Sequence, residues 1–296
     1  MKRTLASAFL LLLICMSILI LSGCTPAGTV QPQKGAAKIA VVLGAGASRG
    51  FAHIGVLKVL EANKIPVHMI VGTSAGSFVG SLYAYGFNAF QLQKMALGIE
   101  KSDILDLVIP DNGFIKGEKL EEYINTVVRN TPIEKFRIPF YAVTTGIPSG
   151  QELVFSKGNT GLAVRASCSI PGVFRPARIG DKMYVDGGVV SPVSVDTARR
   201  FGADVVIAVD ISADLDTKQP EGTIDTILQS VNIMYSRISA AELSRADVVI
   251  RPKVGYIGSA ELEKRNEAIL EGEKAAYEAL PRIREIIDGL KQAGRL

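Results

Sequence analysis

Residues 67–77, Val67-His-Met-Ile-Val-Gly-Thr-Ser-Ala-Gly-Ser77, join a short apolar run to a helical pattern through a turn of small residues. The turn has the form G-x-S-x-G, with Gly72 and Gly76 on either side of Ser74. Between a strand and a helix, this form makes a sharp bend that lifts the serine hydroxyl above the sheet edge, where the start of the helix offers N–H groups to an oxyanion. Ser74 is therefore a candidate nucleophile.

Strand and helix patterns alternate on both sides of this turn. Apolar runs predict strands at 38–43, 67–71, 139–144, 204–210 and 246–251, and helical spacing predicts helices at 51–63, 75–85, 118–129 and 263–291. The last helix should break or restart at Pro281, because proline cannot continue the backbone hydrogen-bond pattern. The alternation predicts an α/β fold in which helices cover both faces of a mostly parallel sheet, with ligands beyond the carboxyl ends of the strands.

A second G-x-S-x-G match, Gly46-Ala-Ser-Arg-Gly50, also lies between a strand and a helix. The pattern alone therefore does not choose between Ser48 and Ser74. The first loop additionally carries Gly44 and the basic Arg49. A glycine-rich loop that leads into a helix exposes several N–H groups to an anion, so we expect this loop to form an oxyanion hole rather than to supply the nucleophile.

The glycines of the first loop also allow a nucleotide-binding interpretation, because Gly44-x-Gly46-x-x-x-Gly50 resembles a variant dinucleotide fingerprint. That fold needs an acidic residue at the end of the second strand to hold the ribose, and this strand ends Met69-Ile-Val-Gly72 without one. Nucleotide binding is the weaker interpretation. The formal net charge of +4, from 33 basic and 29 acidic residues, gives no indication of a nucleic-acid partner.

The two histidines of the chain limit the choice of a base for Ser74. His68 precedes Ser74 on the same strand, roughly 20 Å back at ~3.3 Å per residue. His53 lies in the first predicted helix, where we expect a structural or loop-stabilising role. Because no histidine follows Ser74, the triad of the α/β-hydrolases is excluded and a carboxylate must act. Asp186, which opens Asp186-Gly-Gly188 after a short apolar run, is the candidate, although Asp-Gly-Gly alone is most often a turn.

Four segments in this order resemble the bacterial patatin-like phospholipases: residues 44–57, 72–76, 166–174 and 186–188. The resemblance implies a three-layer α/β/α fold and a lipid acyl hydrolase (a phospholipase, lysophospholipase or esterase) that uses a Ser–Asp dyad and an acyl-enzyme. It implies that Ser74 is the nucleophile and Asp186 the base. The other site residues that it implies are Gly44, Gly46, Ala47 and Arg49 in the oxyanion hole, Gly72 and Gly76 in the nucleophile elbow, and Gly187 and Gly188 in the turn of the proton acceptor. We expect no metal and no other cofactor.

The chain departs from this family pattern in two places. The family loop usually has glycine where Ala45 or Ala47 stands here, and alanine would be strained by about 1 kcal/mol if that position needs a positive φ. Shortly after the Asp-Gly-Gly segment the family often has asparagine, where this chain has Ser191. An alternative function is therefore a catalytically silent scaffold of the same fold in the cell envelope, which would bind lipid or a partner.

The amino-terminal residues are typical of a bacterial lipoprotein signal. A basic start and an apolar run to Leu21 lead through small residues to Cys24. An uncleaved membrane anchor is the alternative, since the run is almost long enough to span a bilayer. With cleavage before Cys24, the expected organisation is residues 1–23 as signal peptide, 24–37 as lipidated cysteine and flexible tether, and 38–296 as the acyl-hydrolase domain.

A lipid on Cys24 would place the protein on a membrane of the bacterial cell envelope. Thr25 is not acidic, and the resemblance to sorted lipoproteins of double-membrane bacteria therefore suggests the outer membrane. The expected localisation is the outer membrane or the periplasmic face. The expected partners are a lipid or phospholipid substrate and that membrane, while the oligomeric state is open. Cys168 would be left without a disulfide partner, and its apolar neighbours predict a buried thiol rather than a nucleophile.

Overall fold

The computed structural model describes residues 35–109, 113–213 and 219–296. The expected signal peptide and Cys24 lie outside the described residues. The chain divides into two units, Met1–Gly35 and Ala36–Leu296, and the second contains the helices and strands given below. No helix among the described residues is both long and apolar enough to cross a bilayer.

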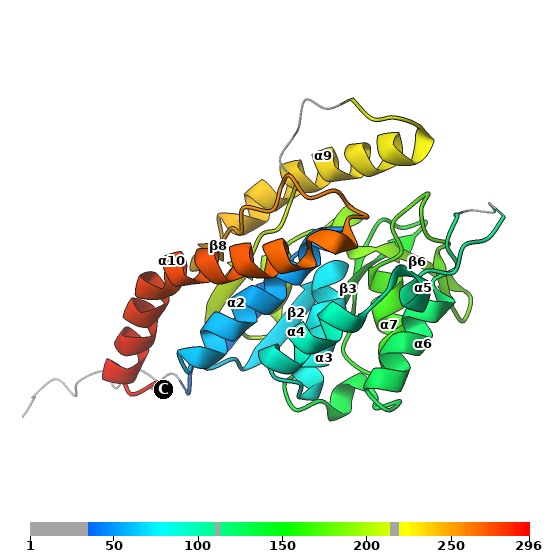
Figure 1. Ribbon diagram of the computed structural model, residues 1–296. Helices are drawn as coiled ribbons and strands as arrows, with labels where there is room; N and C mark the ends of the chain where they lie inside the picture. The colour runs from blue at the N-terminus through cyan, green and yellow to red at the C-terminus, as the bar shows by residue number, and fades with distance from the viewer. Residues whose placement is uncertain (1–34, 110–112, 214–218) are drawn as a thin grey trace, which may run out of the picture. The chain divides into compact units, whose positions relative to one another are not determined.

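An eight-stranded mixed sheet forms the centre of the Ala36–Leu296 unit (Figure 1). Its strands are β1 (Ile39–Leu43), β2 (Met69–Thr73), β3 (Phe140–Ile147), β4 (Glu152–Phe155), β5 (Ala177–Ile179), β6 (Lys182–Asp186), β7 (Val205–Val209) and β8 (Val248–Ile250). The order across the sheet is β5-β6-β3-β2-β1-β7-β8, with β4 paired to β3. The neighbours β3-β2-β1-β7-β8 are parallel, as the alternation of patterns predicts, whereas β4, β5 and β6 join through antiparallel pairs.

Helices connect the strands and cover both faces of the sheet (Figure 1). They are α2 (Phe51–Ala62), α3 (Ala75–Tyr85), α4 (Ala89–Gly98), α5 (Lys101–Ile104), α6 (Glu118–Val127), α7 (Thr160–Ser167), α8 (Val195–Arg200), α9 (Thr223–Leu243) and α10 (Arg265–Gln292). Short 3-10 turns are η1 (Ala47–Gly50), η2 (Ile133–Lys135), η3 (Gly187–Val189) and η4 (Leu262–Lys264). The helices and parallel strands expected from the sequence are present within a few residues of the expected bounds.

Strand β1 shows how the three layers are held together. All five of its residues are buried, because both faces of a parallel sheet are covered. Ile39, Val41 and Leu43 point into the larger core, which also contains residues of α2, α3, α6 and α10. Ala40 and Val42 point into a smaller core with residues of α8 and the end of α9. The structure therefore has the three-layer α/β/α architecture that the sequence predicts.

Helices α2 and α10 cross with their backbones in direct contact. A Cβ at Gly55 would lie 1.9 Å from the carbonyl oxygen of Ile269, and a Cβ at Gly272 would lie 2.0 Å from that of Ala52. No side chain fits at either glycine, so the two helices pack as closely as backbones allow.

The expected break at Pro281 is wrong, because α10 is one helix that contains this proline. Proline removes a hydrogen bond and bends a helix, and Figure 1 shows α10 bending toward its C-terminal end. The side chain of Pro281 is exposed, while its neighbours Leu280 and Ile283 are buried in the larger core. Tertiary packing on both sides of the proline therefore holds the helix together.

Replacing Gly272 by alanine should lower the free energy of unfolding by about 1–3 kcal/mol, because the new methyl group overpacks the α2–α10 crossing. Urea unfolding followed by circular dichroism measures the change. Gly289→Ala in the same helix is the matched control, since nothing lies within 4 Å of its Cβ position. This control should raise stability by about 0.5–1 kcal/mol. Equal effects of the two variants would contradict the close packing.

Candidate active site

The register of the sheet brings three separate loops to one level. Leu43 of β1 pairs with Gly72 of β2, so the glycine-rich loop begins beside the turn that carries Ser74. Thr73 pairs with Val143 of β3, and the next residue of β3, Thr144, pairs with Asp186 of β6. Ser74 and Asp186 thus lie on either side of β3 at almost the same height. The antiparallel direction of β6 delivers the carboxylate to this level.

Ser74 occupies a strained turn between β2 and α3. Its φ and ψ are 54° and −123°, a conformation that few residues other than glycine adopt. Its backbone N–H donates to Ser167 Oγ at 2.9 Å, and that hydroxyl in turn donates to the carbonyl oxygen of Val143 at 2.6 Å. Ser77 Oγ donates to the carbonyl oxygen of Ser74 at 2.7 Å. These bonds hold the bend that the G-x-S-x-G pattern predicts.

The two positions that flank Ser74 in the elbow leave no room for a side chain, which explains why both residues are glycine. A Cβ at Gly76 would lie 1.9 Å from the carbonyl oxygen of Leu43, and a Cβ at Gly72 would lie 2.6 Å from that of Gly76. The first turn of α3 can therefore press directly against the end of β1. Gly50 makes a similar contact, because its Cβ position lies 2.6 Å from Cβ of Ala75. The elbow and the glycine-rich loop are in contact along this line.

Asp186 is fully buried beside Ser74. Its Oδ1 accepts a hydrogen bond from the Gly188 N–H at 2.7 Å, whereas Oδ2 has no hydrogen-bond partner among the described residues. Burial raises the pKa of Asp186 to about 6, against the opposing effects of the Ser74 hydroxyl, the Gly188 N–H and the Tyr235 hydroxyl. A carboxylate with such a pKa is a stronger base than an exposed aspartate and is still ionised at neutral pH.

The turn after Asp186 is packed against two elements. A Cβ at Gly187 would lie 2.3 Å from the carbonyl oxygen of Val143, and a Cβ at Gly188 would lie 2.3 Å from the ring of Tyr235 on α9. The hydroxyl of Tyr235 is buried and has no hydrogen-bond partner among the described residues. Burial and, to a smaller extent, the interaction with Asp186 raise the pKa of Tyr235, so the hydroxyl keeps its proton. Tyr235 therefore presents an unused donor close to the carboxylate.

The glycine-rich loop has two kinds of N–H group. Those of Gly44 and Ala45 donate to the carbonyl oxygens of Val209 and Pro192, at 3.1 and 2.9 Å. Those of Gly46 and Ala47 donate to no acceptor within the described residues. The loop is thus fixed through its first two residues, while the next two keep the free donors that an oxyanion needs.

Ala47 has a φ of 51°, in the left-handed region where glycine is the favoured residue. The strain anticipated for an alanine in this loop therefore falls on Ala47. It is of order 1 kcal/mol and does not remove the N–H group of the residue from the loop. Ala45, the other alanine at issue, is buried and has no positive φ.

Arg49 and Ser48 are occupied by contacts away from Ser74. The Arg49 guanidinium is buried and donates to the carbonyl oxygens of Ile211 at 2.9 Å and Ile257 at 3.1 Å, and to Asn232 Oδ1 at 3.0 Å. Ser48 Oγ donates to the carbonyl oxygen of Ser259 at 2.8 Å. Both side chains tie the glycine-rich loop to the C-terminal part of the chain.

The two histidines have structural roles. Burial lowers the pKa of His53 to about 4, so its ring is neutral, and Nε2 lies 2.9 Å from the carbonyl oxygen of Gly44, to which it donates. The expected loop-stabilising role of His53 is confirmed. His68 Nδ1 accepts a hydrogen bond from the Ile39 N–H at 3.0 Å, at the far end of the sheet. Neither ring contacts Ser74 through a hydrogen bond.

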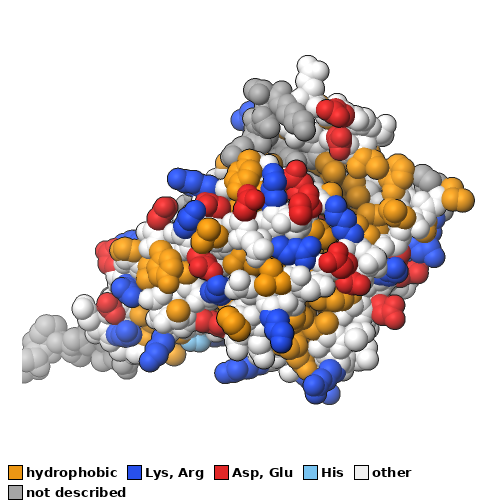
Figure 2. Space-filling model, viewed as in Figure 1, with side chains coloured by type: hydrophobic (Ala, Val, Ile, Leu, Met, Phe, Trp, Pro, Cys, Tyr) orange, Lys and Arg blue, Asp and Glu red, His pale blue; other side chains and the backbone are white. Residues whose placement is uncertain are grey.

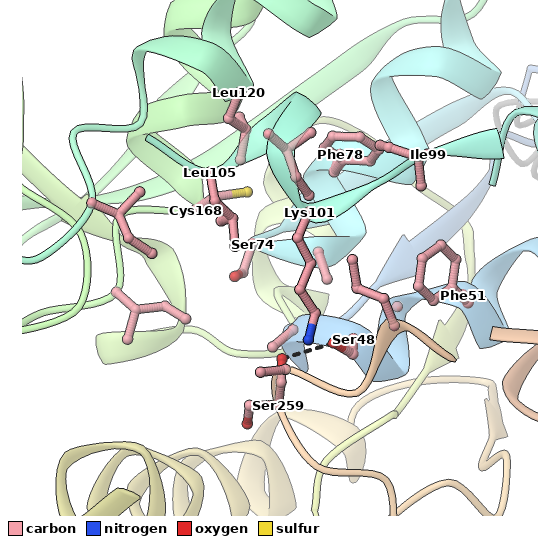
Figure 3. Close-up of a pocket in the computed structure, with 18 of the residues that line it drawn as sticks. Ser48, Phe51, Ser74, Phe78, Ile99, Lys101, Leu105, Leu120, Cys168 and Ser259 are labelled. Carbon is pink, nitrogen blue, oxygen red and sulfur yellow. Dashed lines mark hydrogen bonds between the residues drawn. The ribbon is translucent and has the colours of Figure 1, made fainter. Parts of the chain in front are cut away.

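A pocket of about 340 Å³ opens beside Ser74 (Figure 3). Its walls are mainly apolar side chains from α2 to α5, the segment around Phe174 and the start of α9. Cys168 also lines it, and the expected burial of this thiol is confirmed. Burial raises the pKa of Cys168, so the thiol stays protonated. An apolar pocket with a buried serine hydroxyl in its wall suits an acyl chain whose carbonyl carbon is to be attacked.

The rim of this pocket is partly hydrophobic. Leu107, which lines the pocket, has 78% of its surface exposed, and nearby Ile109 has 88%. Figure 2 shows hydrophobic side chains gathered between the start of α9 and the segment after α5, while charges of both signs are interspersed over most of the remaining face. Exposed apolar residues at a pocket entrance are typical of proteins that meet apolar ligands or surfaces.

Sequence reasoning did not identify three residues around this site. Ser167 positions the Ser74 backbone, Tyr235 faces Asp186, and Lys101 lines the pocket entrance. Ser167 lies in a segment that carries the family resemblance, so a signal existed for it. Tyr235 and Lys101 lie on α9 and α5, two helices that the apolar spacing of the sequence did not predict. No motif around either residue indicates a functional role.

The comparisons with known proteins point to one family. A family model described as patatin-like phospholipase matches residues 41–199. Lysophospholipase NTE1 of Pyricularia oryzae is 29% identical over 280 residues, which cover 83% of this chain and 19% of that protein. Human patatin-like phospholipase domain-containing protein 6 is 36% identical over 187 residues, which cover 60% of this chain and 14% of that protein. The chain spans less than a fifth of the length of either relative.

A solved structure, that of VipD from Legionella pneumophila, has a similar fold. The TM-score is 0.55 and the sequence identity 13%, and the match covers 84% of this chain and 67% of the other. At this identity the likeness concerns the fold alone. The family model, in contrast, covers more than half of the chain, including the end of β1, the elbow and the Asp186 turn. The chain therefore belongs to the patatin-like phospholipase family.

Proposed function

We propose that the protein is a serine hydrolase of lipid acyl esters that works through Ser74 and Asp186. The observation that carries this proposal is the convergence of four features at the end of one apolar pocket. These are a strained serine, a buried carboxylate with a raised pKa, a pair of unused backbone N–H groups, and a lining suited to a hydrocarbon chain. The family membership and the names of the relatives support a phospholipid or lysophospholipid as substrate.

The first half-reaction forms an acyl-enzyme. Ionised Asp186 accepts the proton of the Ser74 hydroxyl while the oxygen attacks the ester carbonyl carbon. The N–H groups of Gly46 and Ala47 stabilise the negative charge that develops on the carbonyl oxygen. The tetrahedral intermediate then collapses, the bond to the alcohol oxygen breaks, and Asp186 returns the proton to the leaving alkoxide. The acyl group remains on Ser74 and its chain remains in the pocket.

The second half-reaction releases the fatty acid. Asp186 accepts a proton from a water molecule, which attacks the acyl-enzyme carbonyl. The same two N–H groups stabilise the second oxyanion. Collapse of this intermediate restores the Ser74 hydroxyl with the proton from Asp186 and frees the carboxylic acid. A base with a pKa near 6 is suited to both directions of proton transfer at neutral pH.

Replacing Ser74 by alanine should abolish ester hydrolysis, with a loss of at least about 10³-fold in kcat, because the attacking oxygen is removed. Hydrolysis of a short p-nitrophenyl ester and of a lysophospholipid measures the loss. Ser48→Ala is the matched control, since its hydroxyl is bonded to the Ser259 carbonyl and should be dispensable for attack. Full activity of Ser74→Ala would exclude the proposed mechanism. A wild-type protein that a fluorophosphonate probe fails to label at Ser74 would favour the silent scaffold instead.

The pH profile of kcat/KM should have an acidic limb near pH 6, because the catalytic base is lost as Asp186 gains a proton. Tyr235→Phe removes a donor that favours the ionised carboxylate, so it should raise the pKa of Asp186 and move this limb to higher pH. The expected shift is up to about one unit, the equivalent of one hydrogen bond. Tyr277→Phe, an exposed tyrosine on α10, is the control and should leave the limb in place. A Tyr235→Phe profile that superimposes on that of the wild type would show that its hydroxyl does not act on Asp186.

We also propose that Cys24 carries lipid and holds the domain on a membrane of the bacterial cell envelope, on the outer membrane or the periplasmic face. The Leu21-Ser-Gly-Cys24 sequence after a basic and apolar start supports this. Several acyl chains on one cysteine bind a bilayer far more firmly than a single chain does. The exposed hydrophobic rim of the pocket would then be held close to its lipid substrate.

Replacing Cys24 by alanine should release the protein from the membrane fraction of cells that express the full chain, because the attachment sulfur is missing. Sedimentation of membranes followed by immunoblotting measures the distribution, and Cys168→Ala serves as the cysteine control. Metabolic labelling with an alkyne fatty acid should mark the wild type and Cys168→Ala but not Cys24→Ala. Pelleting of Cys24→Ala to the same extent as the wild type would contradict anchoring through this residue.

A further inference from the structure

The pocket beside Ser74 is lined mainly by apolar side chains. Among the described residues that line it, Lys101 is the only one with a charged side chain. Lys101 begins the short helix α5 and is exposed, so its ammonium stays in contact with water. No described residue forms an ion pair or hydrogen bond with that ammonium. The entrance of the pocket therefore presents a cation without a protein partner among the described residues.

The side chain of Lys101 is directed at the reacting end of the pocket. Figure 3 shows it extending toward Ser48 and Ser259, with Ser74 facing the same space. Ser48 and Ser259 are bonded to each other and are neutral, so neither supplies a counter-charge. On the same segment, Asp103 is occupied by the backbone N–H of Glu100 at 2.8 Å. An anionic group at the entrance would thus meet Lys101 without displacing an existing ion pair.

We propose that Lys101 binds the phosphate of the lipid headgroup and so makes the enzyme select phosphorylated lipids over neutral lipids of the same chain. This inference rests on the proposed function. In a glycerophospholipid, only the carbons of glycerol separate the scissile ester from the phosphate. With the ester at Ser74, the phosphate therefore stays within a few atoms of Ser74, in the part of the pocket toward which Lys101 extends (Figure 3). A monoacylglycerol fills the same pocket and leaves the ammonium unpaired.

The experiment compares three lipids with one acyl chain in common: lysophosphatidylcholine, lysophosphatidic acid and monoacylglycerol, each dispersed in micelles of a non-ionic detergent. Lys101→Gln should lower kcat/KM for the two phosphorylated lipids by about three- to ten-fold, as expected for a single charge pair that water still reaches. It should leave kcat/KM for monoacylglycerol within about two-fold. Lys101→Arg should keep the preference, Lys101→Glu should weaken it further, and rising salt should reduce it in the wild type.

Lys94→Gln is the matched control, because Lys94 is an exposed lysine of the neighbouring helix α4 that does not line the pocket. It should leave all three rates unchanged. Equal loss on monoacylglycerol and on the phosphorylated lipids in Lys101→Gln would overturn the proposal and assign the lysine to the reaction itself. Equal activity of wild type and Lys101→Gln on all three lipids would overturn it as well.

A binding measurement separates this proposal from the proposed function. In a Ser74→Ala background, a non-hydrolysable ether analogue of lysophosphatidylcholine should bind about three- to ten-fold more weakly when Lys101 is also replaced by glutamine. This result can be obtained whether or not the wild type hydrolyses esters. Glycerol 3-phosphate, which has the phosphate without the chain, should not compete at equal concentration, because the apolar pocket supplies most of the affinity. Competition by glycerol 3-phosphate would indicate a site for free phosphate esters and overturn the assignment to lipids.

Discussion

Backbone contact between the end of β1 and the first turn of α3 is the constraint on which the candidate site depends. The carbonyl oxygen of Leu43 lies only 1.9 Å from where a Cβ at Gly76 would be, so hydrogen alone fits there. This contact places the start of α3 against the glycine-rich loop. Ser74 and the free N–H groups of Gly46 and Ala47 therefore belong to one site. Any side chain at residue 76 would push Ser74 away from these N–H groups.

Holding this arrangement costs stability in two ways. Ser74 and Ala47 both have a positive φ, at about 1–3 kcal/mol for each such residue. Burial raises the pKa of Asp186 above its unfolded value, so stability from this group is fully present at low pH and is lost as the pH rises through about 6. Above about pH 6, where Asp186 is ionised, its charge therefore opposes folding. The hydrogen bond from the Ser74 N–H to Ser167 Oγ and the one from the Gly188 N–H to Asp186 offset part of this cost.

The sequence predicts the fold well because apolar periodicity reports burial. The parallel strands are continuous apolar runs in the sequence. The G-x-S-x-G turn requires small residues at fixed positions, which form a recognisable motif. The strands β4 to β6 are short and partly exposed, so their pattern of apolar residues is weak. The sequence therefore does not predict the pairing of β6 with β3, which sets Asp186 opposite Thr144. The direction of the Arg49 side chain could not be predicted from the sequence either, because its hydrogen-bond acceptors are more than 150 residues away along the chain.

Helix α9 extends the site beyond the part of the chain that the family model matches, which ends at residue 199. Tyr235 of α9 packs on Gly188, and Glu242 accepts hydrogen bonds from Ser191 Oγ at 2.5 Å and from the Val193 N–H at 3.0 Å. The same helix thus touches the Asp186 turn and the segment that follows it. Ser191 stands where the family often has asparagine, and its hydroxyl donates a hydrogen bond to Glu242 of this helix. The family model therefore covers the candidate reacting groups Ser74 and Asp186, whereas Tyr235, one of the groups that act on the pKa of Asp186, stands on a helix outside the match.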